Sequence, residues 1–578
     1  MGQQFSKTYE PSYNPRIFSL WSVFQKGARS DTASSQAQQS PPEVARSEDF
    51  HQHGRSDSVK DVIPTRNDRP VDESIGTTVN TKDLASNQDS DSDADCDCGP
   101  GQDIAKILAT LDQQQIPQLA ASLFKRLHPE SSDDDAQPSI GELNHGSYNV
   151  VLPLTFNNGT RWALKIPIGG HSESWNEDNA TELSSEVCTM KLIKRETTVP
   201  IPEIFDFCLT TDNIIKVPYI LMSWIEGVRL CDLWFSHRTD GVDPEVNRER
   251  CARAIQGVAS AIFELGKISS NTSGRIIGFD TENQPILGPE RSVDEAATMR
   301  KWYIEEDKDE GCVYMEHPIT SDPKPHYLLG MDRNPGQDNW DKGNGGLVRQ
   351  LVHWIDEPSE MDTFVMTHPD FNYQNIIVSE EGELRGIIDW EGARFSPRSV
   401  GNEALPAWLT RDWAVGLYGW TEEMEAGEEP DDCWEDSPQT LSSYRNVYRD
   451  AMKKLVAENR PNDPVDLCRA SLITTNISFA ARVPLCRQQT LRKIYLAIWA
   501  AAYPKWAASQ EEYRQWSVVV SDEVDCDDDC DDHGQEDGID GPPSFLDVLD
   551  MFAEDRVPED LLTILRRGFD ALLAKESL

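Results

Sequence analysis

The clearest pattern of apolar and polar positions lies in residues 361–394. Two short apolar runs, 376–378 and 386–388, are separated by the polar turn 379–383, which contains a glycine. Short β-rich runs around such a turn predict a β-hairpin. Both ends of a hairpin lie at the same edge, so polar side chains placed there can converge. These side chains are Asp370 and Asn375, just before the first strand, and Asp389, just after the second.

A second β pattern begins at residue 140. Residues 143–152 predict two strands joined by a tight glycine turn, and residues 155–167 predict a hairpin with an Asn-Gly turn. A helix is expected over 181–193, and the apolar run 219–227 predicts a buried strand that ends in a turn. A β-rich unit therefore precedes the first hairpin.

Apolar residues at helical spacing flank this unit. Two short amphipathic helices are expected before it, at 104–111 and 119–127. The last segment, 544–578, predicts one or two amphipathic helices that dock on the domain or bind a partner. Further helices are expected at 404–409, 441–459 and 491–503.

Length and composition define the two ends. A chain of 578 residues holds about two to four domains, or one large domain with tails. Residues 27–101 are polar and poor in aromatics, and 521–541 form an almost continuous acidic tract. Both are predicted to be disordered, because they bury too little apolar surface and the tract repels itself. Protein partners of these tails are a further expectation.

The net charge restricts the partners and the cysteines restrict the compartment. A charge of −46, from 100 acidic and 54 basic residues, argues against nucleic acid, because phosphate contacts need a basic face. The 12 cysteines follow no regular framework, and no secretory signal precedes them. An intracellular, cytoplasmic location is therefore expected. The apolar stretch 496–502 is too short to span a membrane.

The N-terminus carries one targeting pattern. Residues 1–7 fit M-G-x-x-x-[ST], with Gly2 as the site of N-myristoylation. A single myristoyl chain binds membranes only marginally, so weak membrane association is the alternative location. The other interpretation is an ordinary start that happens to place glycine second.

The loop before the hairpin suits phosphoryl transfer. It has the sequence H-P-D-x-x-x-x-N, with Asp370 and Asn375 at the spacing of a kinase catalytic loop, and Asp389 ends the later element I-I-D-W-E. Such a reaction needs a base for the acceptor hydroxyl and oxygen ligands for Mg²⁺. The alternative is a buried polar hairpin in which His368 and Asp370 cap local backbone.

The β-rich unit supplies candidate nucleotide-binding residues. The turn at Gly146 and Ser147 would let backbone N–H groups approach phosphates. Lys165, on a strand after Ala-Leu, would lie near the α- and β-phosphates and pair with Glu186 of the following helix. Glu186 as a solvated surface residue is the alternative. The unit resembles the nucleotide-binding lobe of a kinase-like enzyme, which implies that Met222 and Trp224 lie at the connection between the lobes, where adenine binds; both are equally good core residues.

From about residue 140 to 393 the chain resembles the aminoglycoside phosphotransferase family. The motifs are N-H-G-S-Y-N-V-V, A-L-K-I-P, S-E-V-C-T-M, Y-I-L-M-S-W-I-E-G, H-P-D-F-N-Y-Q-N-I-I-V and G-I-I-D-W-E, and their wording resembles the large fungal branch. The resemblance implies ATP and Mg²⁺ as cofactors and a small-molecule hydroxyl as acceptor. It implies Asp370 as base, Asn375 and Asp389 as metal ligands, and Lys165 and Glu186 as the phosphate lysine and its partner.

Two departures from related patterns bear on the function. Pro369 stands where many bacterial resistance enzymes have glycine, so the bacterial substrate range does not follow. No D-F-G or A-P-E follows Asp389, which argues against the first alternative, a protein kinase. The second alternative is an inactive kinase-like binding or scaffold protein. The polar stretch 290–345 is expected to recognise the acceptor, with Trp302, Tyr303 and Tyr314 as pocket candidates.

We therefore predict an α+β, two-lobe protein-kinase-like fold with a small β-rich N-lobe and a large α-helical C-lobe. The expected divisions are a disordered tail (1–101), short helices (102–137), the N-lobe (138–227), the C-lobe with the catalytic loop and insertion (228–520), an acidic disordered linker (521–541) and C-terminal helices (542–578).

Overall fold

The computed structural model describes residues 100–574, except 147, 240, 304–312, 337, 356–362, 422–423, 425–434, 461–466 and 510–540. All of the described residues belong to one structural unit, and a second unit, Asp31–Gly99, lies outside them. The myristoylation pattern at Gly2, almost all of the predicted N-terminal tail and the acidic linker also fall outside the described residues.

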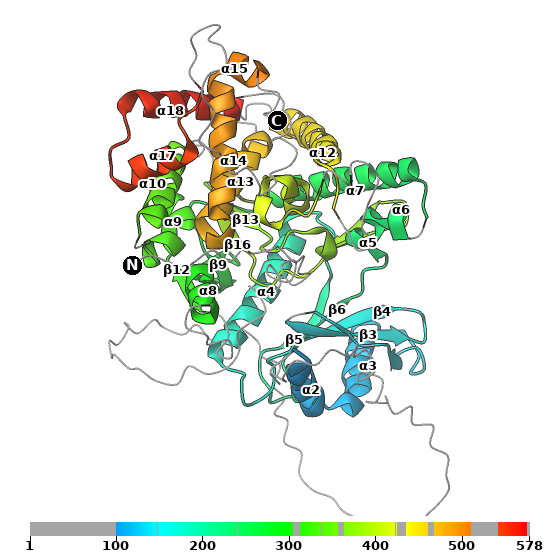
Figure 1. Ribbon diagram of the computed structural model, residues 1–578. Coiled ribbons are helices and arrows are strands. Elements are labelled where there is room, and N and C mark those ends of the chain that lie inside the picture. The colour runs from blue at the N-terminus through cyan, green and yellow to red at the C-terminus, as the bar shows by residue number, and fades with distance from the viewer. Residues whose placement is uncertain are drawn as a thin grey trace, which may run out of the picture. The chain divides into compact units, whose positions relative to one another are not determined.

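An antiparallel six-stranded sheet forms the N-lobe (Figure 1). Its strand order is β1–β3–β4–β6–β5, and β2 pairs with β3. The side chains of β4 alternate between the two faces: Leu164 and Ile166 join a core with helices α2 and α3, whereas Lys165 faces helix α4. The bounds are α2 Pro100–Thr110, η3 Gln113–Gln115, α3 Ile116–Leu127, β1 Pro138–Ile140, β2 Asn144–His145, β3 Asn149–Phe156, β4 Arg161–Pro167, α4 Glu177–Glu196, β5 Ile204–Cys208 and β6 Tyr219–Ser223.

The connection between the lobes joins the predicted hairpin. Strands β14 (Ile376–Val378) and β15 (Leu384–Ile387) form that hairpin, and β7 (Val228–Arg229), just after the connection, pairs with β14. Gly227 precedes β7 with a φ of +145°, and a Cβ there would meet the carbonyl oxygen of Val378. Only glycine suits such a backbone at such a close approach.

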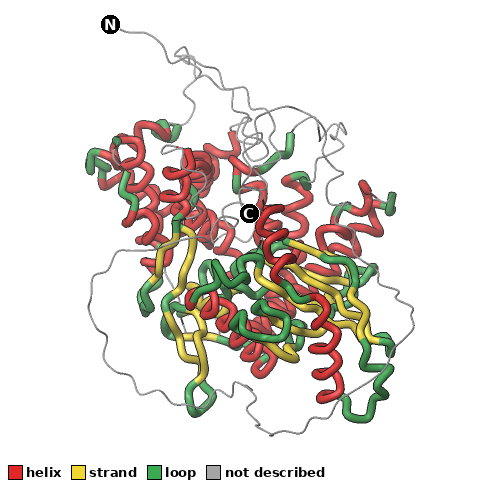
Figure 2. The backbone as a smooth tube through the Cα atoms, turned by 90° about the horizontal axis from the view of Figure 1, so that it is seen from below, coloured by secondary structure: helices red, strands yellow, loops and turns green. Residues whose placement is uncertain are grey.

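The C-lobe is mainly helical; Figure 2 shows the helices in red and the strands in yellow. The C-terminal helices α17 and α18 pack on α10 and α14, so the predicted amphipathic helices dock on the domain. The helical elements are α5 Leu230–Trp234, α6 Ser236–Thr239, α7 Pro244–Leu265, α8 Glu295–Tyr303, α9 Lys324–Arg333, α10 Asn339–Trp354, η4 Tyr373–Asn375, η5 Ala407–Trp413, η6 Val415–Leu417, α12 Pro438–Asn459, α13 Leu467–Arg482, α14 Pro484–Ala502, α15 Pro504–Ser509, α17 Phe545–Ala553 and α18 Glu559–Ala574.

The expected acceptor insertion is more regular than its composition suggests. Strand β11 pairs with β12 on either side of α8, and α9 and α10 follow. The polar residues of β11 and β12 hide the alternation by which strands are recognised. The α-helix expected at 404–409 is not formed; the 3₁₀ element η5 begins within that segment, at Ala407. The remaining strands are β8 Ser269–Ser270, β9 Arg275–Phe279, β10 Pro285–Gly288, β11 Glu290–Val293, β12 Tyr314–His317, β13 Phe364–Thr367 and β16 Arg394–Pro397.

These elements form the α+β kinase-like fold that the sequence predicts. A β-rich lobe with one long helix, α4, is followed through a short connection by a helical lobe that carries the polar loop and hairpin (Figure 1).

Candidate active site

The loop of residues 368–375 is organised by His368. Its Nδ1 accepts a hydrogen bond from the backbone N–H of Asp370 at 3.2 Å, so Nε2 carries the proton and donates to the carbonyl of Ile388 at 2.9 Å. Burial lowers the pKa of His368, which keeps the ring neutral. The neutral ring therefore ties the loop to the residue just before Asp389.

Asp370 and Asn375 lie side by side in this loop. The amide nitrogen of Asn375 donates to the backbone carbonyl of Asp370 at 2.9 Å and to its Oδ2 at 3.0 Å, and Gln374 donates to the same Oδ2 at 2.9 Å. Burial raises the pKa of Asp370 against the opposing effect of His368 and these donors. The carboxylate is thus held in one orientation and has an increased affinity for a proton.

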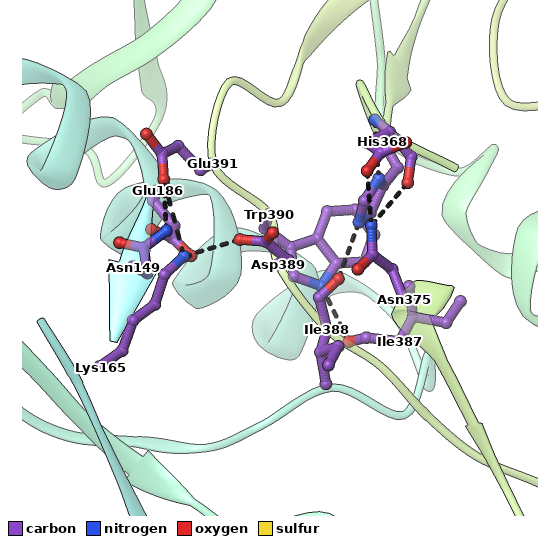
Figure 3. A network of polar contacts seen from close by, with 11 residues as sticks. Asn149, Lys165, Glu186, His368, Asn375, Ile387, Ile388, Asp389, Trp390 and Glu391 are labelled. Carbon is purple, nitrogen blue, oxygen red and sulfur yellow. Dashed lines mark hydrogen bonds and ion pairs between the residues drawn. The ribbon is translucent and has the colours of Figure 1, made fainter. Parts of the chain in front are cut away.

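Lys165 lies among three carboxylates (Figure 3). Its Nζ is 2.7 Å from Glu186 Oε1, 2.8 Å from Asp389 Oδ1 and 3.9 Å from Glu391 Oε2. Burial alone would lower the pKa of Lys165, but Asp389, Glu186 and Glu391 together raise it. The ammonium is therefore charged, and it is outnumbered by the carboxylates around it.

The carboxylates differ in their exposure. The Glu186 side chain is 2% exposed, and its burial, together with the charges of Asp389 and Glu391, raises its pKa to about 7 against the opposing effect of Lys165. Burial also disfavours the charged form of Asp389, but Lys165 outweighs that effect and lowers the pKa of Asp389. Its side chain is 42% exposed, so this ionised carboxylate is accessible to solvent.

The backbone of Asp389 is strained. Its φ of +64° lies in the left-handed region, where residues other than glycine are uncommon. The neighbours on both sides hold it: the N–H of Ile388 donates to the carbonyl of Asn375 at 2.9 Å, and the Trp390 indole donates to the carbonyl of Ile387 at 3.1 Å. Strain of this kind persists where the surroundings fix a functional geometry.

One contact in the site has no sequence signal. The side-chain amide of Asn149, at the start of β3, donates to Glu391 Oε2 at 2.9 Å (Figure 3). The two residues are 242 positions apart. Each belongs to a sequence motif, but neither motif predicts that the two side chains meet. It joins the strand after the glycine turn to the segment that carries Asp389.

The other residues predicted to bind the nucleotide lie in different parts of the N-lobe. Gly146 is exposed, and its N–H donates to the carbonyl of Asn149 at 2.9 Å; Ser147 lies outside the described residues. Met222 pairs with Ala163 on β4 and so shares the sheet face of Lys165. Trp224 is instead covered by the Arg161 guanidinium, 4.4 Å from its ring centre.

The expected acceptor residues come from separate elements of the insertion. Trp302 and Tyr303 lie in the last turn of α8, and Tyr314 begins β12. The Arg291 guanidinium lies 4.3 Å from the centre of the Tyr314 ring. In the described part of the chain, no three His, Cys, Asp or Glu side chains are grouped as a metal site.

The comparisons with known proteins return fungal relatives, and no family model matches the chain. A subtelomeric hrmA-associated cluster protein of Aspergillus fumigatus is 34% identical over 335 residues, which are 48% of this chain and 62% of that protein. Altered inheritance of mitochondria protein 9 of Kluyveromyces lactis is 19% identical over 307 residues, 46% of this chain and 49% of that protein. The matches thus span less than two thirds of these relatives.

The names of these relatives contradict the expected cytoplasmic location. The Kluyveromyces lactis protein and a Candida albicans protein, 24% identical over 182 residues, are both named mitochondrial. The irregular cysteine pattern behind that expectation does not distinguish the cytoplasm from mitochondria. Among the described helices, none has the length and apolar character to cross a membrane.

Two solved structures of phosphotransferases resemble the chain at low identity. A thermostable mutant of the aminoglycoside phosphotransferase APH(4)-Ia, in complex with AMP-PNP and hygromycin B, is 12% identical with a TM-score of 0.33, over 64% of this chain and 97% of that one. Macrolide 2'-phosphotransferase type I is 12% identical with a TM-score of 0.29, over 71% and 99%. At these scores, the kinase-like fold rests on the chain's own elements.

Proposed function

We propose that this chain is an ATP- and Mg²⁺-dependent phosphotransferase of the aminoglycoside phosphotransferase family, on its large fungal branch, with a small-molecule hydroxyl as acceptor. One observation carries the proposal: buried Lys165 bonds to both Glu186 and Asp389, and the loop of Asp370 is tied to the same segment. In phosphoryl transfer, a lysine–glutamate pair positions phosphates, and an aspartate at a strand end holds the metal.

The donor set near Lys165 fits Mg²⁺. Asp389 and Asn375 offer oxygen atoms, which Mg²⁺ prefers, and the Asn375 nitrogen points to Asp370, which leaves the amide oxygen on the other side. The three carboxylates around one ammonium leave a negative excess that a divalent cation would neutralise. These residues would hold Mg²⁺, which would supply positive charge against the negative charge that develops on the phosphates.

Asp370 is suited to receive the acceptor proton. A buried carboxylate with a raised pKa holds a proton better than a solvated one, which a general base requires. The donors on Oδ2 fix its orientation, so the hydroxyl would be aligned before transfer. We further assign to the nucleotide Met222, on the side of the sheet that carries Lys165, and Gly146, in the turn before β3.

Thermal shift with Mg²⁺ and AMP-PNP tests this function, with the wild type compared against Asp389→Ala. A ligand at about a hundred times its dissociation constant stabilises the folded state by about 2.7 kcal/mol. We expect a shift in the wild type that is lost in the variant. A wild type without any shift would favour an inactive binding protein. A positive result would justify a screen of alcohol acceptors, with cationic sugars and amino alcohols first.

A further inference from the structure

Helix α4 carries three carboxylates on one face. They recur every fourth residue, which places them in one row along the helix. Only the last, Glu186, belongs to the lysine pair of the proposed nucleotide site. Basic residues from three strands meet this row: Arg291 of β11 meets Asp178, Arg275 of β9 meets Glu182, and Lys165 of β4 meets Glu186.

Burial shows which of the outer two pairs holds the helix. The Asp178 side chain is 74% exposed and 3.5 Å from Arg291, so that pair contributes little. Glu182 and Arg275 are only 19% and 13% exposed. Removing one member of a buried pair leaves an uncompensated charge, which is strongly unfavourable. The Arg275–Glu182 pair is therefore the outer contact that resists movement of α4.

Arg275 is fixed to the C-lobe at its base. The preceding residue, Gly274, has a φ of +136°, and its carbonyl accepts a hydrogen bond from the N–H of Phe395 at 2.8 Å. A Cβ on Gly274 would lie 2.7 Å from the carbonyl oxygen of Gly288, so the turn has no room for a side chain. Phe395 belongs to β16, which follows Asp389 and pairs with β13 before the catalytic loop.

The β9–β10 hairpin (residues 275–288) follows α4 beyond this pair. Arg195, in the last turn of α4, donates to the carbonyl of Asn283 at 2.8 Å, and its guanidinium lies 5.3 Å from the centre of the Phe279 ring. The hairpin of the C-lobe thus contacts the N-lobe helix at Glu182 and again at Arg195.

We propose that Arg275 is a positioning residue for the nucleotide site. Arg275 holds α4 through Glu182, so that Glu186 on the same helix reaches Lys165. Glu182 and Glu186 are about one helical turn apart, so a rotation or shift of α4 moves both. This inference rests on the proposed function for its catalytic meaning. The contact itself exists without nucleotide and can be tested separately.

Hydrogen exchange of the nucleotide-free full chain provides that test. Arg275→Met should increase exchange in peptides from Glu177–Glu196. If that variant folds poorly, Glu182→Gln is measured in its place and should give the same increase. Arg248→Gln is the matched control, because it removes an exposed ion pair with Glu245 on α7. Unchanged exchange in α4, or an equal increase throughout both lobes, would overturn the proposal.

Calorimetry with Mg²⁺ and AMP-PNP then measures the effect on the nucleotide site. We expect Arg275→Met to weaken binding by about 10- to 100-fold, as for other residues that orient a site from outside it. Arg275→Lys should recover most of the affinity, and the control should match the wild type. Binding in Arg275→Met equal to wild type would overturn the positioning role. A wild type that does not bind AMP-PNP would refute the proposed function, while exchange in α4 would still decide the contact.

Discussion

Glu186→Gln should remove a pH dependence of stability that arises from crowding around Lys165. Burial raises the pKa of Glu186 from its ordinary value of 4.5 to about 7. The folded state then binds this proton more tightly than the unfolded state does. The stabilisation is fully present below pH 4.5 and is lost as the pH rises through about 7, and the pKa difference corresponds to about 3 kcal/mol.

Melting temperatures at pH 5.5 and pH 8, without nucleotide and with a chelator, measure this effect. Glutamine has no proton to lose, so the melting temperature of the variant relative to wild type should rise toward pH 8. Glu196→Gln is the control, because Glu196 lies on the same helix with a side chain that is 48% exposed. The same relative melting temperature at both pH values would refute the reasoning, since Lys165 alone would then keep Glu186 ionised.

Two other substitutions test the loop and the connection between the lobes. Asp370→Asn should lower phosphoryl transfer to an acceptor by about 100- to 10,000-fold while Mg·AMP-PNP still binds, as followed by ATP consumption and calorimetry; loss of nucleotide binding would contradict its place on the acceptor side. Gly227→Ala should destabilise the protein by more than about 1 kcal/mol, because its φ of +145° and the nearby Val378 carbonyl exclude a Cβ. A melting temperature equal to wild type would refute that.

Local patterns predict local elements well in this chain. The β14–β15 hairpin, helix α4 and the alternation around Lys165 follow from spacing within a few residues. The sequence pattern does not predict strands β11 and β12, because Glu290, Arg291 and His317 are polar residues that are not typical of strands. Their charges are satisfied by partners elsewhere, such as Arg394, which is 2.9 Å from Glu290.

The candidate site also combines residues placed by local motifs with contacts between distant segments. The motifs place Asp370, Asn375 and Asp389 at the ends of one hairpin, and the fold brings Lys165, with its partner Glu186, to Asp389. Pairs between distant segments, such as Asn149 with Glu391, depend on how the lobes meet. No periodicity within either segment encodes that meeting.

The connection at Gly227 determines how the lobes can move. On one side, the Arg161 carbonyl of β4 accepts from the N–H of Trp224, and its guanidinium is 2.9 Å from Glu226. On the other side, β7 is hydrogen-bonded to β14. The backbone between these two attachments is short, so opening of the lobes would be a hinge rotation about it, with little sliding of packed helices. The ion pairs of Lys165 with Asp389 and of Arg275 with Glu182 join the two lobes, so both pairs would have to break before such a rotation.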